Sequence, residues 1–397
     1  MRGGSDGIWR VHYLTSRAGD AIKMLTSDQP PSPDRSSPAP DWLMPIIYGP
    51  TASGKSQLAL AIVAELTTRG IQSEIVTADA FQIYRGMDIG TAKPSPEERA
   101  RVRHHLIDIC SPFAPALGDQ PAGASIGPRE GIGGFTVENW LAMAEPCIAD
   151  IRARGAVPVV VGGTSLYVQS LLFGLFRGPS SDESLRLLLQ ATPIAELRAE
   201  LERVDPAGAA RIHPADVRRT IRAVEVFRLS GKPITEHQQQ WEGRPPRADA
   251  RLLVLEWDKD ALSRRINARV KGMFAAEHGL VTEIAGLLSQ GTLNWQAAEA
   301  IGYKQVLPLF NDPATGTPRT DEHGRVLIPG GQRGVRLMEE AAEHVKIATR
   351  RLAKNQRTWL TRLSQTPGTL PLDGQLPPQE LARLACDAVI TPPPEGR

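Results

Sequence analysis

Cysteine is scarce in this sequence, and its three copies are far apart. Cys110, Cys147 and Cys386 form no C-x-x-C pair and stand in no Cys/His pattern, which excludes the usual zinc-finger spacings and a disulfide framework. Free cysteines fit a reducing compartment, so we expect a cytoplasmic protein. A run of about eighteen apolar residues is also missing, so no segment is expected to span a membrane.

An excess of charge of either sign is missing too. The chain has 46 Lys and Arg residues against 44 Asp and Glu residues, a formal net charge of +2 over 397 residues. Any surface for nucleic acid must therefore come from local clusters of basic residues. The length, together with an apolar fraction of 41%, suits two domains or one domain with a large insertion.

One stretch of the sequence carries a specific signal for phosphate binding. It reads Gly49-Pro50-Thr51-Ala52-Ser53-Gly54-Lys55-Ser56 and stands between a predicted buried strand and an Ala/Leu-rich helix over 57–66. The glycines of G-x-x-x-x-G-K-[ST] permit a turn that points backbone N–H groups inward, Lys55 adds positive charge, and the Ser56 hydroxyl is placed to ligate Mg²⁺. The positive end of the following helix faces the same anion. The pattern does not say whose phosphates are bound.

Strands and helices alternate through residues 42–181. Strands are predicted at 74–78, 105–109 and 157–161, and helices at 136–154 and 166–172. This alternation indicates a parallel sheet with its ligands at the carboxyl edge, so we predict an α/β fold of the P-loop NTPase type. A strand at 251–257 returns to the sheet.

The remaining segments differ in composition. Residues 182–248 are helical and basic and are predicted to form an insertion domain, after which residues 249–364 complete the core with helices and a loop over 311–332. Residues 1–41 are expected to be a disordered extension, with a targeting peptide as the alternative that Asp6 and Asp20 disfavour. Residues 114–134 read as a flexible insertion and residues 365–397 as a Pro-rich, weakly ordered tail.

The helix predicted at 337–362 has two distinct faces. Val345, Ala348, Leu352 and Trp359 share one face, and Lys346, Arg350, Lys354 and Arg357 share another. A solvated charged face over a core stripe is the usual meaning of this pattern, and a nucleic-acid surface is the alternative.

Two polar residues end predicted strands. Asp79 follows the strand after the phosphate-loop helix, where its carboxylate can face bound phosphates and either hold Mg²⁺ or accept a proton. An Asp that caps a turn is the simpler explanation. Thr164 follows two glycines that allow a ligand close to the backbone, although a tight strand-to-helix turn would use the same residues.

Several segments together resemble the tRNA dimethylallyltransferase (tRNA isopentenyltransferase) family. The phosphate loop is similar to the family's GPTASGK[ST], residues 77–84 to its D-S-x-Q-x-Y segment, and residues 84–94 to its Y-x-x-M-D-I-G-T-A-K-P segment. Further similar segments are 105–108, 161–167, 205–226, 301–305 and 349–359. The similarity runs in family order from Pro45 to Leu360. The absence of the zinc finger of eukaryotic members makes the chain similar to the bacterial type.

The resemblance implies a prenyltransferase. Such an enzyme transfers the dimethylallyl group from dimethylallyl diphosphate to the N6 amine of the adenosine 3′ to the anticodon, in tRNAs that read codons starting with U, and releases pyrophosphate. The phosphate loop would bind the diphosphate through Mg²⁺. Asp79 would accept a hydrogen bond or proton from the amine, and Arg265 or Arg269 would help to neutralise pyrophosphate. The adenine is expected to be flipped out of the stacked loop.

The resemblance also implies a surface for the anticodon stem-loop of tRNA. We expect a monomeric protein without membrane contact. The predicted tRNA-binding residues are Asp79, Ala80, Phe81, Gln82, Thr164, Arg186, Arg218, Arg219, Thr220, Ile221, Arg222, Lys304, Arg350 and Lys354. Ala80 stands where the family commonly has Ser, so no hydroxyl can act at that position.

Two other functions fit part of the pattern. A P-loop kinase would require a purine nucleotide and release a phosphorylated product, and a non-enzymatic RNA-binding module would bind tRNA without turnover. The D-I-G-T-A-K-P segment and the basic insertion disfavour the kinase, and Asp79 beside an intact phosphate loop disfavours the binding module. ATP binding stays open.

Overall fold

The computed structural model describes residues 42–114, 134–175, 178–179, 182–239, 244–275, 278–312 and 315–390. The predicted disordered extension at 1–41 and nearly all of the predicted insertion at 114–134 lie outside these residues. Among the helices of the described ranges, none combines the length and the apolar character that crossing a bilayer demands.

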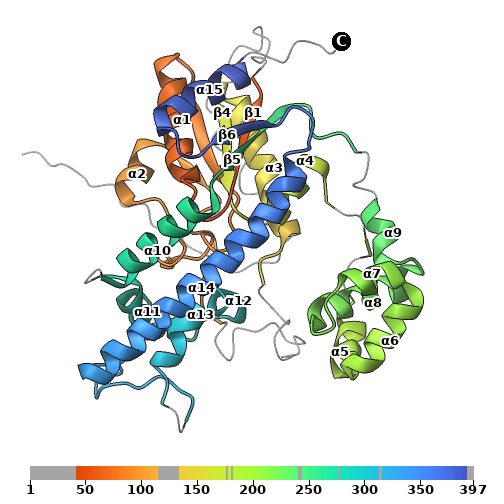
Figure 1. The fold of residues 1–397 in the computed structure, drawn as a ribbon, viewed down its shortest axis with the longest axis vertical. Helices are drawn as coiled ribbons and strands as arrows, with labels where there is room; N and C mark the ends of the chain where they lie inside the picture. The colour runs from red at the N-terminus through yellow and green to blue at the C-terminus, as the bar shows by residue number, and fades with distance from the viewer. Residues whose placement is uncertain are drawn as a thin grey trace, which may run out of the picture. The chain divides into compact units, whose positions relative to one another are not determined.

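A parallel sheet forms the centre of the described chain (Figure 1). Its strands are β1 (Met44–Tyr48), β2 (Ser73–Thr77), β3 (His104–His105), β4 (Val157–Gly162), β5 (Ala250–Glu256) and β6 (Leu370–Asp373), in the order β3-β2-β4-β1-β5-β6. All the pairings are parallel. β1 and β4 are buried throughout, as central parallel strands covered on both faces must be. The predicted α/β fold is therefore confirmed.

Helices cover both faces of this sheet. On one face, α1 (Lys55–Thr68) and α15 (Pro378–Ile390) pack with inward residues of β4, β5 and β6. On the other, α3 (Val137–Ala153), α4 (Ser165–Phe173) and the end of α14 (Gly331–Leu363) pack on alternate residues of β1 and β5. The predicted helix at 136–154 begins where expected, because the Thr136 side chain accepts the Asn139 N–H as a cap.

The remaining helices form two groups. The insertion domain consists of α5 (Glu183–Ala191), α6 (Ile194–Val204), α7 (Pro206–Arg211), α8 (Val217–Ser230) and α9 (Ile234–Gln238), with an apolar core of its own. The other group consists of α2 (Pro96–Arg101), α10 (Lys259–Ala275), α11 (Leu280–Leu288), α12 (Trp295–Ala298), α13 (Tyr303–Val306) and the 3₁₀ helix η2 (Leu307–Leu309). Three of these elements, α12, α13 and η2, contain only four, four and three residues.

Two predictions of local structure fail. The strand predicted at 105–109 stops after His105, because Leu106 and Asp108 adopt left-handed backbone conformations, with φ of 58° and 55°, that a strand cannot contain. The buried face of α14 also differs from the predicted one. Leu352, predicted to be in the core, is 37% exposed, whereas Thr349 and Gln356 are buried.

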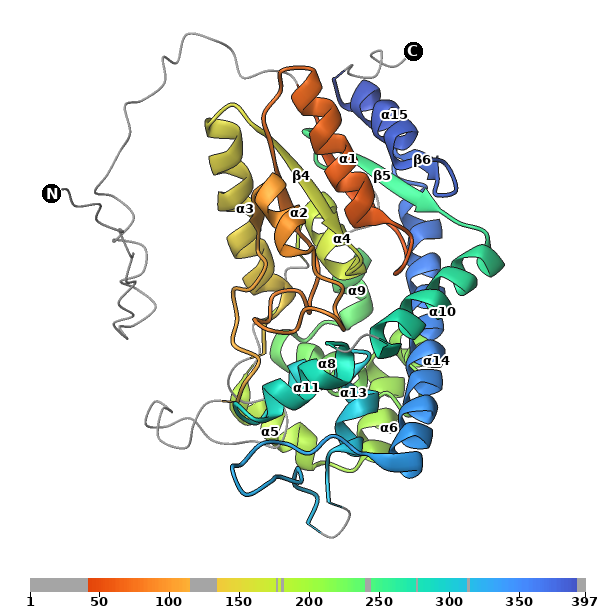
Figure 2. The same cartoon turned by 90° about the vertical axis from the view of Figure 1, so that its left-hand side faces the viewer.

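The prediction of a weakly ordered tail is wrong for residues 370–390. β6 pairs with β5, and α15 buries Leu381, Ala385 and Cys386 against α1. Figure 2 shows α15 beside α1. The prolines that suggested disorder are compatible with this structure, because Pro371 lies on an edge strand and Pro378 opens a helix.

The packing of α15 on the sheet predicts that shortening the Leu381 side chain lowers the stability of the fold. Leu381→Ala should lower the free energy of unfolding by about 2–5 kcal/mol, because it empties a buried site between α15 and the sheet. Leu384→Ala, 47% exposed on the same helix, should change it by less than about 0.5 kcal/mol. Urea unfolding of both variants measures the difference, and equal values would contradict the packed position of α15.

Candidate active site

The segments that follow β1, β2 and β4 line one pocket of about 570 Å³ at the carboxyl edge of the sheet. The structure brings together most of the residues predicted for the chemistry. Lys55, Ser56, Asp79, Arg265 and Arg269 all line this pocket.

The phosphate loop has the backbone conformation that anion binding requires. Ala52 and Gly54 have φ of 63° and 92°, and left-handed residues between right-handed ones turn consecutive N–H groups to one side. Gly54 directly precedes α1, so the positive end of that helix faces the same point. The Ser56 hydroxyl lies in the first turn of α1 and lines the pocket.

Two side chains from the β5 end of the sheet hold the loop from outside. The Trp257 indole N–H donates to the Ser53 carbonyl at 3.0 Å, and Arg265 Nε donates to the Ala52 carbonyl at 2.8 Å. The Arg265 guanidinium also stacks on the Trp257 ring, 4.6 Å from its centroid. Arg265 was predicted as a pyrophosphate partner, whereas Trp257 was missed because only the fold brings it to the loop.

Two positively charged side chains, Lys55 and Arg269, line the pocket beside the loop. Lys55 Nζ donates to the Pro50 carbonyl at 2.7 Å, and burial, with a smaller contribution from Arg269, lowers the pKa of Lys55 to about 8 against the opposing effect of Asp79. Burial also lowers the pKa of Arg269, whose Nη1 lies 3.3 Å from the Thr51 hydroxyl. Two desolvated cations next to a backbone anion site are stabilised when a polyanion binds.

Asp79 lies two residues after the end of β2 and faces these cations. Its Oδ1 accepts the N–H groups of Phe81 and Gln82 at 2.9 and 3.2 Å. Within the described ranges all the hydrogen bonds of this carboxylate go to Oδ1, which leaves Oδ2 for a ligand. The Asp79 carboxylate therefore caps a turn, as the simpler explanation predicts, and it also lies in the pocket. Its role toward a ligand stays a prediction.

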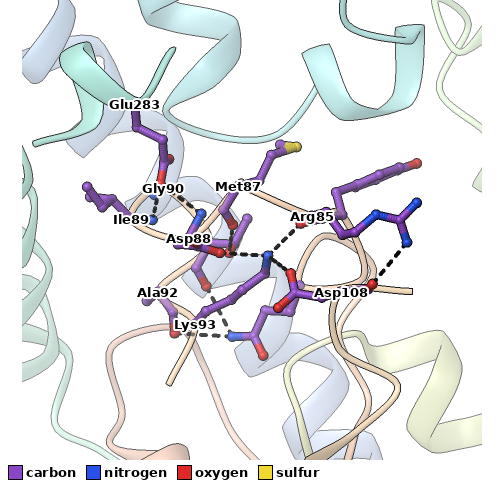
Figure 3. Close-up of polar contacts among 12 residues, drawn as sticks. Arg85, Met87, Asp88, Ile89, Gly90, Ala92, Lys93, Asp108 and Glu283 are labelled. Carbon is purple, nitrogen blue, oxygen red and sulfur yellow. Dashed lines mark hydrogen bonds and ion pairs between the residues drawn. The ribbon is translucent and has the colours of Figure 1, made fainter. Parts of the chain in front are cut away.

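The segment 84–94 forms one wall of the pocket and is built around Lys93 (Figure 3). The buried Lys93 ammonium donates to Asp88 at 2.8 Å, to Asp108 at 2.5 Å and to the Tyr84 carbonyl at 2.5 Å. Arg99 also pairs with Asp108. The charge of Lys93 is thus fully compensated, and this lysine is part of the wall and not a free cation for a ligand.

Glu283 of α11 fixes the same wall from the other side (Figure 3). Its carboxylate accepts the N–H groups of Asp88 and Ile89 at 2.8 and 2.7 Å and that of Gly90 at 3.4 Å, and the Tyr303 hydroxyl donates to it at 2.5 Å. No local pattern in the sequence indicates Glu283, because the contact joins a helix to a loop almost two hundred residues earlier in the chain.

The wall is tied to the Asp79 turn by one side chain. The Gln82 amide donates to the carbonyls of Thr91 and Ala92 at 3.1 and 3.2 Å. Thr164 holds the other side of the turn, since its hydroxyl accepts the Ala80 N–H at 3.0 Å. This contact uses the backbone of Ala80, so the lack of a serine hydroxyl there leaves it intact.

A smaller and more apolar pocket of about 160 Å³ adjoins the first. The two pockets share Thr51, Asp79, Arg269 and Met273, and the smaller one adds Phe81, Val270, Ile301 and Val345. An apolar group could therefore lie beside an anion held by the phosphate loop.

The residues predicted to bind tRNA on the insertion have different environments. Arg219 is 76% exposed, and Arg218 lies over the Trp295 ring, 5.0 Å from its centroid. Arg186 and Arg222 both pair with the buried Glu225, at 3.0 and 2.7 Å. The side chains of Thr220 and Ile221 are buried within the insertion, so only the exposed arginines present side chains to a partner.

The predicted residues of the C-terminal half lie at the surface. Lys304 pairs with Glu299 at 2.6 Å, and Arg350 donates to Asn267 at 2.7 Å. Arg350 and Lys354 line a groove of about 930 Å³ between α10 and α14, two helices that lie side by side (Figure 2). Lys259, Arg351 and Arg357 line the same groove, which makes it basic.

Comparisons with known proteins identify one family. The family model for IPP transferase matches residues 82–117 and 126–363. The chain is 38% identical to the tRNA dimethylallyltransferase of Geobacter sulfurreducens over 80% of its own length and 88% of that protein.

Solved structures are similar as well. The tRNA isopentenylpyrophosphate transferase of Bacillus halodurans matches 87% of this chain and 96% of that chain, with 30% identity and a TM-score of 0.52. A eukaryotic dimethylallyltransferase solved while acting on tRNA shares the fold, with 24% identity and a TM-score of 0.61 over 83% of this chain and 73% of that chain. The phosphate loop, the Asp79 turn and the family match lead to one conclusion: the chain belongs to the IPP transferase family.

Proposed function

We propose that this protein transfers the dimethylallyl group of dimethylallyl diphosphate to the N6 amine of the adenosine 3′ to the anticodon, in tRNAs that read codons starting with U. The observation that carries the proposal is the joint position of the phosphate loop and Asp79 in one pocket, beside an apolar pocket. The names of the relatives support the transferase over a kinase and over a non-enzymatic RNA-binding module.

The diphosphate lies on the phosphate loop, where backbone N–H groups, Lys55 and Arg269 stabilise its charge. The dimethylallyl group lies in the adjoining apolar pocket. The N6 nitrogen attacks C1 of this group while the C1–O bond breaks, and the electron pair of that bond leaves with pyrophosphate. Cations that are already in place stabilise the charge that develops on the leaving group.

Asp79 removes the proton that the adenine amine loses. Its Oδ1 is held by two backbone N–H groups, so Oδ2 can point at the amine without further ordering. The adenine reaches this position only when it is flipped out of the anticodon loop, because a stacked base cannot enter a pocket at the sheet edge. Arg218 and Arg219 on the insertion, with Arg350 and Lys354, bind phosphates of the anticodon stem.

Mg²⁺ fits the residues present at the loop. The described ranges contain no group of three or more His, Cys, Asp or Glu side chains that could hold a metal ion. Mg²⁺ usually binds through one or two protein ligands together with substrate phosphates and water, and the Ser56 hydroxyl supplies one such ligand. When bound, the ion neutralises charge on the diphosphate.

The direct test is incubation with dimethylallyl diphosphate, Mg²⁺ and unmodified tRNA, followed by digestion and mass spectrometry of the nucleosides. An adenosine heavier by one dimethylallyl group, formed without ATP and lost when EDTA is added, supports the proposal and the role of Mg²⁺. Unmodified adenosine despite confirmed tRNA binding would refute the transferase.

Asp79→Asn should lower the transfer rate by at least about 100-fold, because a positioned proton acceptor is lost. The amide oxygen of Asn can still accept the N–H groups of Phe81 and Gln82, so the turn is expected to keep its shape. Single-turnover kinetics measures the effect. A rate near that of the unmodified protein would exclude Asp79 as the base.

The lowered pKa of Lys55 predicts a pH dependence of donor binding. The Lys55 side chain is positively charged below pH 8 and loses this charge as the pH rises through 8. An ordinary lysine would stay charged to about pH 10. Affinity for dimethylallyl diphosphate should therefore fall above pH 8, by up to about tenfold per pH unit. In Lys55→Arg, which stays charged, the pH profile measured by calorimetry should be flat, and parallel profiles would contradict the assignment.

Arg219→Glu should weaken tRNA binding and reduce its salt dependence, because an exposed phosphate contact is replaced by repulsion. Binding of dimethylallyl diphosphate should not change. Arg383→Glu, the same charge change at an exposed position of α15, is the control and should leave tRNA affinity unaltered. Filter binding at several salt concentrations compares them, and equal affinities of the two variants would refute the tRNA role of Arg219.

A further inference from the structure

Gln356 is a buried polar residue of α14 that joins two parts of the site. Its Oε1 accepts the Thr51 N–H of the phosphate loop at 2.8 Å, and its Nε2 donates to the Gly163 carbonyl after β4 at 2.8 Å. The side chain is 6% exposed and lines the main pocket. It was not among the residues predicted for the site, although it lies within the segment 349–359 that resembles the family.

The chemistry of this contact requires an amide. The Thr51 N–H needs an acceptor and the Gly163 carbonyl needs a donor, and a primary amide presents both on adjacent atoms. A carboxylate would satisfy only Thr51 and an ammonium only Gly163. The two backbone partners also fix which end of the amide is oxygen.

The surroundings of Gln356 leave it little freedom. A Cβ on residue 163 would lie 2.7 Å from Nε2, so glycine at this position makes room for the amide. The Tyr48 hydroxyl, from the end of β1, donates to the Gln356 main-chain carbonyl at 3.1 Å and contacts the Ser165 hydroxyl at 2.7 Å. Both the backbone and the side chain of Gln356 are therefore anchored to the sheet edge.

Each partner of Gln356 leads to a different half of the reaction. The Thr51 hydroxyl contacts Arg269, which faces the diphosphate. Gly163 precedes Thr164, whose hydroxyl holds the Ala80 N–H directly after Asp79. The same side chain thus touches the part of the site that binds the leaving group and the part that carries the proton acceptor.

We propose that Gln356 is a positioning residue that holds the leaving-group side and the acceptor side of the site at a fixed separation. The inference rests on the proposed transferase function, because displacement at an allylic carbon needs nucleophile and leaving group on opposite sides at a set distance. Gln356 itself contacts neither reacting atom. Its loss should lower the rate of the chemical step more than the affinity for either substrate.

The test compares Gln356→Met with Gln332→Met, the same substitution at an exposed position of α14. Methionine fills a similar volume but makes neither hydrogen bond. In single-turnover experiments with saturating dimethylallyl diphosphate and tRNA, Gln356→Met should be at least tenfold slower than the unmodified protein. Its dissociation constant for tRNA should stay within twofold, and Gln332→Met should match the unmodified protein in both measurements.

A second variant separates the two hydrogen bonds. Gln356→Glu keeps the acceptor for Thr51 but loses the donor for Gly163 and places negative charge near the diphosphate, so it should be slower and should also bind dimethylallyl diphosphate more weakly. If Gln356→Met does not fold, as thermal unfolding would show, Gln356→Glu provides the same comparison of rate with tRNA affinity.

Transfer by Gln356→Met within twofold of the unmodified rate would overturn the inference. A loss of rate matched by an equal loss of tRNA affinity would also overturn it, because a purely structural role lowers both together. Absence of transfer by the unmodified protein is a different result, since it refutes the proposed function and with it the inference that depends on it.

Discussion

The phosphate loop can bind an anion only while its backbone N–H groups point at one place, and this constraint organises the site. Left-handed conformations at Ala52 and Gly54 create the arrangement, but a non-glycine residue in that conformation is strained and needs support from its surroundings. The support comes from outside the loop: Trp257 and Arg265 hold its carbonyls, and Gln356 holds one of its N–H groups.

The wall of the pocket formed by residues 84–94 contains a buried charge. Lys93 has no exposed side-chain surface, and an unpaired buried ammonium would cost several kcal/mol. Asp88, Asp108 and the Tyr84 carbonyl surround it, and Glu283 collects the neighbouring backbone N–H groups. Left-handed residues at Ala92 and Asp108 are held within this network. The wall is therefore rigid because its polar groups are satisfied, and the Gln82 side chain carries that rigidity to the Asp79 turn.

Local patterns in the sequence were sufficient for the elements that local physics determines. The strands β1 and β4, the phosphate loop and the start of the helix at 136 were predicted from neighbouring residues alone, and the structure agrees. Contacts between residues far apart in the sequence were not predictable in this way: β6 pairs with β5, and Glu283 and Gln356 bind backbone groups 193 to 305 residues earlier. The proline content led to a wrong prediction of weak order for residues 370–390, because an edge strand and the first turn of a helix both tolerate proline. All five residues of the basic segment 218–222 were predicted to contact tRNA, but the side chains of Thr220 and Ile221 are buried within the insertion.

The spacing between the phosphate loop and its supports has a consequence for synthesis of the protein. Thr51 and Gln356 are 305 residues apart, and Ser53 and Trp257 are 204 apart. At roughly 5–20 residues per second on the ribosome, the loop emerges roughly 15 to 60 seconds before α14 can reach it. During that interval the nascent chain carries the phosphate-binding sequence without the contacts that shape it. The supported loop is therefore complete only after α14 has been synthesised, so that a chain terminated before α14 would display the motif without a properly supported site.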